Sequence, residues 1–130
     1  MGTKTEYARV HRLAVAAADK AYDAVNAGQY VAVQHENPLN DNSPIVKVWE
    51  QPFELYGFAW VTHPGNTGYG RWLVKTGKAT KHYGGGVGPR ASRGTGYERK
   101  MAWAQAYADV VNDSGILPPN KKAYAEGRLD

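Results

Sequence analysis

The segment 97–114 (YERKMAWAQAYADVVNDS) constrains the fold most, because its apolar side chains cover about half of a helical circumference. A helix with so wide an apolar arc must be covered on more than one side, so we expect it at the centre of the core. Thr95 and Glu98 predict a capping box at its start, and Gly115 predicts its end. The apolar arc comprises Tyr97, Met101, Trp103, Ala104, Tyr107, Ala108, Val110 and Val111.

A second amphipathic helix is predicted over about residues 4–27. Thr3 and Glu6 form a capping box before it, and Gly28 offers a C-terminal stop. Its apolar face is rich in alanine, which permits close approach to a sheet. His11 falls on that face, and we interpret it as a core histidine with one satisfied nitrogen rather than as a ligand.

The remaining periodic segments predict strands and one short helix. Pro52 separates the second predicted strand from the third, and these two strands are close enough in sequence to form an antiparallel hairpin. Gly57 marks a candidate bulge in the third strand. A turn at 63–68 leads into a short helix at about 69–76, which ends at Gly77. The predicted strands are 30–34, 45–50, 53–62 and about 121–129.

This order of elements predicts an α+β fold. We expect a small antiparallel or mixed sheet of about four strands, with the two long helices packed on one face of it. A chain of 130 residues is long enough to bury one core, so residues 1–130 are expected to form a single domain. The glycine- and arginine-rich stretch at about 78–96 is expected to be a loop or a distorted strand.

Positive charge is concentrated in residues 71–100, which carry +7, whereas the rest of the chain carries −3. This pattern is typical of a localised anion-binding surface. Aromatic residues lie between the cations, and single-stranded nucleic acid needs both charges for its backbone and rings for its bases. We therefore predict phosphate contacts from Arg71, Lys75, Lys78, Lys81, Arg90, Arg93, Arg99 and Lys100, with stacking by Trp72 and Tyr83.

Simpler interpretations of the same residues stay open. The cations can form a solvated face around a core Trp72, and the run 84–88 reads more readily as a flexible loop than as a phosphate cradle. That run lacks the spacing of a dinucleotide or Walker motif. Lys100 falls inside the apolar arc of its helix, so it either snorkels past the sheet edge or is partly buried as a ligand contact.

Several classes of protein are disfavoured by what the sequence lacks. The absence of cysteine excludes disulfides, thiolate nucleophiles and cysteine-based metal sites, and fits a cytoplasmic protein. We predict no metal, no cofactor and no catalytic residue. We also predict no membrane span, since no apolar stretch reaches about 18 residues. An acid/base pair of His82 and Tyr83 is the enzymatic alternative.

Three stretches carry a resemblance to known sequences: 57–61 (GFAWV), 97–116 beginning YERK, and 123–130 (AYAEGRLD). With the first helix, they resemble small uncharacterised proteins encoded by tailed bacteriophages. The resemblance implies no activity. It implies two roles, namely binding of nucleic acid or a nucleotide, or binding of a host or virion protein as a host-factor inhibitor, anti-defence protein or minor virion component. The expected location is the host cytoplasm or the virion.

Overall fold

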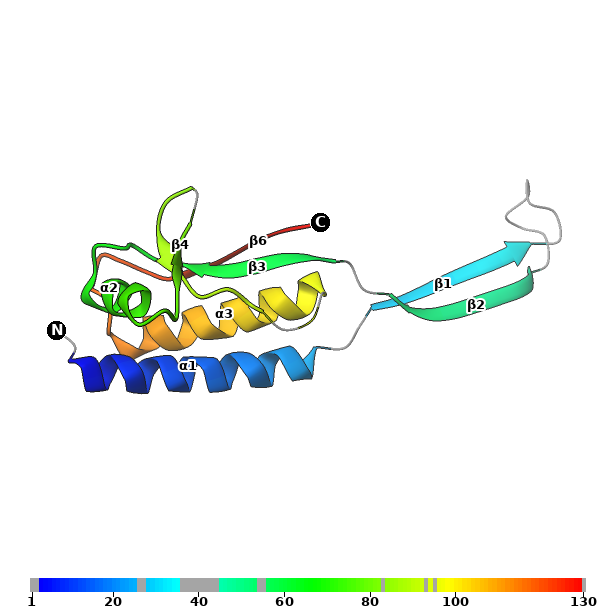
Figure 1. Cartoon of the computed structure of the whole chain (residues 1–130). Helices are drawn as coiled ribbons and strands as arrows, with labels where there is room; N and C mark the ends of the chain where they lie inside the picture. Colours follow the sequence, from blue (N-terminus) through cyan, green and yellow to red (C-terminus); the bar gives the residue numbers. More distant parts are fainter. Residues whose placement is uncertain are drawn as a thin grey trace.

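The computed structural model describes residues 3–25, 28–35, 45–53, 56–82, 84–92, 94 and 96–129. It is an α+β structure, as the sequence predicts, and Figure 1 shows how its helices and antiparallel strands are arranged. In chain order the elements are α1 (Lys4–Ala24), β1 (Gly28–His35), β2 (Ile45–Phe53), β3 (Gly57–Thr62), α2 (Gly68–Lys75), β4 (Thr80–Lys81), β5 (Val87–Gly88), α3 (Tyr97–Ser114) and β6 (Tyr124–Leu129).

Local capping signals place most helix ends where they were predicted. The Thr3 hydroxyl accepts a hydrogen bond of 3.3 Å from the Glu6 amide at the start of α1, and α3 ends at Gly115 in the left-handed conformation. Two details differ. The helix α1 ends at Ala24, before Gly28, which instead opens β1, and the N-cap of α3 is Gly96. Thr95 lies outside the described residues.

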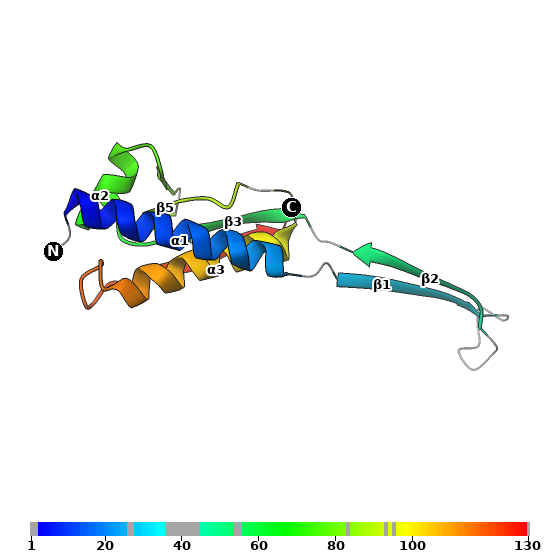
Figure 2. The same cartoon turned by 90° about the horizontal axis from the view of Figure 1, so that it is seen from below.

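The central position predicted for α3 is confirmed. It lies between the strands β3 and β6 on one side and the antiparallel helix α1 on the other (Figures 1 and 2). The expectation that both long helices cover the sheet is wrong, because α1 contacts α3 and no strand in the described part of the chain. A ribbon of a few strands about 5 Å apart is only wide enough for one helix about 10 Å across. The alanine face of α1 (Ala14 and Ala18) therefore packs on the helix instead.

The described strands form three two-stranded antiparallel sheets, β1–β2, β3–β6 and β4–β5, so the expected single sheet of about four strands is wrong. The strand β3 has partners along both of its edges. On one side it pairs with β6, where Phe58 is opposite Arg128 and Trp60 is opposite Glu126. On the other side the segment 87–91 runs along it as an irregular strand, with the Val61 amide donating to the Pro89 carbonyl at 2.9 Å. The stretch predicted as a loop or a distorted strand thus contributes to the sheet edge.

The strands β1 and β2 form a hairpin that projects from the helical body (Figures 1 and 2). The predicted pairing of 45–50 with 53–62 is therefore wrong, since β2 pairs with β1 and β3 pairs with β6. Pro52 also lies inside β2, opposite Gln29, rather than interrupting it. A two-stranded ribbon tolerates proline because half of the backbone N–H groups in each strand have no partner in the ribbon.

Polar groups in the core connect the three helices. His11 Nδ1 of α1 lies 2.7 Å from the Tyr107 hydroxyl of α3, which lies 2.6 Å from the Tyr69 hydroxyl of α2. Burial lowers the pKa of His11 and raises the pKa of Tyr69 to about 12, so both are neutral at pH 7. His11 is half-buried, and the prediction that one of its nitrogens has a partner is confirmed.

Candidate functional site

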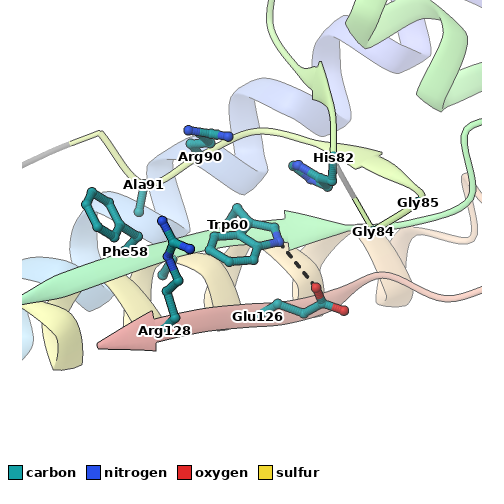
Figure 3. Close-up of a pocket in the computed structure, with 10 residues that line it drawn as sticks. Phe58, Trp60, His82, Gly84, Gly85, Arg90, Ala91, Glu126 and Arg128 are labelled. Carbon is teal, nitrogen blue, oxygen red and sulfur yellow. Dashed lines mark hydrogen bonds between the residues drawn. The ribbon is translucent and has the colours of Figure 1, made fainter. Parts of the chain in front are cut away.

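The outer face of the β3–β6 sheet, opposite α3, carries a cleft of about 450 Å³. It exists because β3 alternates small and aromatic residues: Gly57, Ala59 and Val61 are buried, whereas Phe58 and Trp60 lie on the other face. Figure 3 shows these side chains around the cleft. The described residues that line it with aromatic or charged side chains or with an imidazole are Phe58, Trp60, His82, Arg90, Glu126 and Arg128.

Two cations lie against the Phe58 ring, which is 43% exposed. The Arg128 guanidinium lies 5.5 Å from the ring centroid and the Lys100 amine lies 5.3 Å from it. Lys100 itself is buried, with its amine over the Phe58 ring, and its contact with a ligand stays a prediction. Cations beside an aromatic ring are attracted by its quadrupole, so the ring and its cations form one charged and apolar surface.

Trp60 is held by a polar contact to the next strand. Its Nε1 donates a hydrogen bond of 3.2 Å to Glu126, the one carboxylate among the described residues that line the cleft (Figure 3). This bond occupies the edge of the indole, so the face of the indole can still stack on the ring of a bound base. Glu126 therefore acts as an orienting partner of Trp60.

His82 lies at the end of the cleft, with its ring centroid 6.0 Å from that of Trp60. Its Nε2 lies 2.8 Å from the Val61 carbonyl, which only accepts hydrogen bonds, so Nε2 carries the proton. In the neutral ring this leaves Nδ1 as an acceptor. Tyr83, the partner in the enzymatic alternative, lies outside the described residues.

A second cavity of about 620 Å³ adjoins the cleft, between α2 and the short β4–β5 hairpin. It contains Arg71 and Lys75 from α2 and Lys81 from β4. His82 and Gly85 line both the cleft and this cavity, so the two hollows are adjacent. Together they are lined by five exposed cations: Arg71, Lys75, Lys81, Arg90 and Arg128.

The structure therefore separates the cations that the sequence predicted as one site. Arg71, Lys75 and Lys81 line the second cavity, and Arg90 lines the cleft. Lys78 lies over Trp72, with its amine 5.3 Å from the ring centroid. Arg99 instead lies over the Tyr22 ring, at 5.8 Å, beside the end of α1. Arg93 lies outside the described residues.

Trp72 belongs to an aromatic cluster rather than to the open surface. It is half-buried, stacks on Tyr69 with ring centroids 6.3 Å apart, and contacts Tyr7 at 6.0 Å. Lys78 lies over its ring, as Lys100 and Arg128 lie over that of Phe58, and stacking of a base on Trp72 stays a prediction. The rings that line the cleft are those of Phe58, which is 43% exposed, and Trp60, which is half-buried like Trp72.

Sequence reasoning missed Phe58, Trp60 and Arg128. A signal was present for the first two, because the run GFAWV alternates small and aromatic residues and therefore directs both aromatics to one face. The position of Arg128 follows only from the register that pairs it with Phe58 across 70 residues of chain. No local pattern indicates such a pairing.

None of the helices that the structure describes is long and apolar enough to cross a membrane. The described residues contain no group of three or more His, Cys, Asp or Glu side chains that could hold a metal ion. Searches with protein-family models, against curated proteins and against solved structures found no match.

Proposed function

We propose that this protein binds single-stranded nucleic acid across the outer face of the β3–β6 sheet, without catalysing a reaction on it. The observation that carries the proposal is the cleft in which Phe58 and Trp60 lie beside Arg90 and Arg128, next to a cavity lined by further cations. The charges would neutralise backbone phosphates, and the rings would stack on bases.

The geometry favours a single strand over a duplex. Phe58 and Trp60 are two residues apart on one face of β3, so a strand bound along β3 could stack successive bases on them. Only unpaired bases have free faces for such stacking, because in a duplex both faces are covered by neighbouring base pairs. Arg90 and Arg128 come from the segments on either side of β3, where they could contact the backbone of a strand lying between them.

The test is fluorescence anisotropy of labelled single-stranded DNA, single-stranded RNA and duplex DNA with nuclease-treated protein across a salt series. We expect the single strands to bind more tightly than the duplex. Each phosphate contact to a single strand contributes about −0.7 to the slope of log K against log salt. If all five surface cations bind phosphates, the slope is about −3.5, and the double variant Arg90→Ala/Arg128→Ala lowers its magnitude by about 1.4.

A stacking variant and a charge control separate the two parts of the site. Phe58→Ala should weaken binding by about 1–3 kcal/mol with the salt slope unchanged, since a base loses its ring but phosphate contacts remain. The matched control is Arg12→Ala/Lys20→Ala, which removes two exposed cations from α1, on the far side of α3. Equal losses in the control and in Arg90→Ala/Arg128→Ala would contradict the proposed site. No binding at low salt would exclude nucleic acid and leave a protein partner as the alternative.

A further inference from the structure

We infer that the second cavity, between α2 and the β4–β5 hairpin, holds the terminal phosphomonoester of a nucleic-acid strand, so that the protein prefers phosphorylated strand ends. The inference rests on the proposed function and adds a ligand class to one part of its surface. It assigns the cavity to the end of a strand and the cleft to the nucleotides that precede that end.

Three cations line the cavity, and none of the described lining residues carries a compensating negative charge. Arg71 and Lys75 are one helical turn apart on α2, and Lys81 comes from β4. None of the described lining residues is a carboxylate, and the hydrogen bond recorded for Arg71 goes to the neutral Asn66 carbonyl at 3.1 Å. Like charges this close repel one another, so the arrangement costs stability unless an anion binds.

The number of cations selects between two kinds of phosphate. An internal phosphodiester carries one negative charge, whereas a terminal monoester carries about −1.5 to −2 at pH 7 and offers three acceptor oxygens. The Arg71 guanidinium can donate two parallel hydrogen bonds to two of these oxygens, and the two lysines act as point charges. Three cations therefore match a monoester better than a diester.

The remaining lining provides room and an apolar surface. Val74 and Val87 line the cavity, and its volume of about 620 Å³ exceeds the space that a phosphate alone requires. Gly65, Gly85 and Gly86 form part of the wall without side chains, which leaves space beside the cations. A sugar or base attached to the phosphate can therefore lie against the two valines.

The position of the cavity beside the cleft is the reason for assigning it to an end of the strand. Since His82 and Gly85 line both hollows, a strand stacked on Trp60 reaches the cavity by passing His82. The structure shows no comparable cluster of described cations at the other end of the cleft beyond Arg128 and the buried Lys100. One end of the strand is thus expected to bind in the cavity, and either the 5′ or the 3′ phosphate meets this requirement.

The experiment compares three forms of one short single-stranded oligonucleotide: with a 5′ phosphate, with a 3′ phosphate, and with neither, each labelled at an internal base. We expect one phosphorylated form to bind about tenfold more tightly than the unphosphorylated form, which corresponds to several favourable charge contacts at a partly exposed site. The variant Lys75→Ala/Lys81→Ala should abolish this preference while the unphosphorylated form still binds through the cleft. Arg71→Gln, made separately, should reduce the preference as well.

Lys78→Ala is the matched control. Lys78 is an exposed lysine between the other two in sequence, but it lies over Trp72 rather than in the cavity. The control should therefore keep the preference. Binding of all three oligonucleotides with equal affinity would refute the terminal-phosphate site and leave the proposed function intact. An equal loss of preference in Lys78→Ala would also refute it, whereas no binding of any form would refute the proposed function itself.

Discussion

We expect His63 to make the fold sensitive to acid. The side chain is 1% exposed, and its Nε2 is buried without a hydrogen-bond partner among the described residues. Its Nδ1 lies 3.5 Å from the Pro64 carbonyl, at the limit of a hydrogen bond, and its ring packs against Tyr69. Burial lowers the pKa of His63 to about 4, because the imidazolium would lose its hydration without gaining an anionic partner.

The direction and size of the effect follow from linkage. In the unfolded chain the imidazole has a pKa of about 6.5, so the unfolded state takes up a proton first as the pH falls. Stability from this group is fully present above pH 6.5 and is lost between about pH 6.5 and pH 4. The slope approaches about 1.4 kcal/mol per pH unit, which amounts to about 2 kcal/mol between pH 7 and pH 5.

Urea denaturation at pH 7, 6 and 5, followed by tryptophan fluorescence, measures this loss directly. His63→Phe keeps the ring beside Tyr69 but does not titrate, so its free energy of unfolding should vary by about 2 kcal/mol less over the same range. An NMR titration of His63 in the folded protein would give its pKa independently. Equal pH dependence in the two proteins, or a pKa near 6.5 in the folded state, would refute the reasoning.

Two further predictions concern packing. Gly88→Ala should lower the free energy of unfolding by at least about 2 kcal/mol, because a Cβ there would overlap a backbone carbonyl of β3. Gly84→Ala should change it by less than about 0.5 kcal/mol, since a Cβ at Gly84 would have no atom within 4 Å. Thermal melts of the two variants test this difference. Tyr107→Phe should cost about 1–3 kcal/mol in urea denaturation, since it leaves both the His11 nitrogen and the buried Tyr69 hydroxyl without their partner. Tyr69→Phe should cost less, because Tyr107 keeps its bond to His11, and equal costs would contradict this account of the network.

Much of the local structure could be predicted because its causes lie within a few residues of one another. The Thr3 cap depends on one hydroxyl and an amide three residues away, and the end of α3 depends on Gly115 alone. The central place of α3 could also be predicted, since an apolar arc of that width has to be covered on two sides. The helix α1 was predicted from the sequence, but the element it packs against was not, because alanine permits close approach to a sheet and to a helix equally.

The candidate site, too, could be predicted only in part from the sequence. The sequence showed that cations gather in residues 71–100, and four of them line the two hollows. It did not show that Lys78 covers Trp72 or that Arg99 lies on Tyr22, because those contacts depend on how α1 and α2 pack. A charge count along the chain gives the number of cations in a segment but not where their side chains lie.

The sequence by itself determined where the helices and most strands lie, and that positive charge is concentrated in one segment. The tertiary structure decided which strands pair, and so brought Arg128 to Phe58 and opened the cleft beside Arg90. The physical reason is that helix hydrogen bonds and caps join near neighbours in the chain, whereas strand pairing joins backbone groups that are the same in every residue. Pairing is therefore selected by burial and register across the whole fold, and a surface built on paired strands exists only once that selection is made.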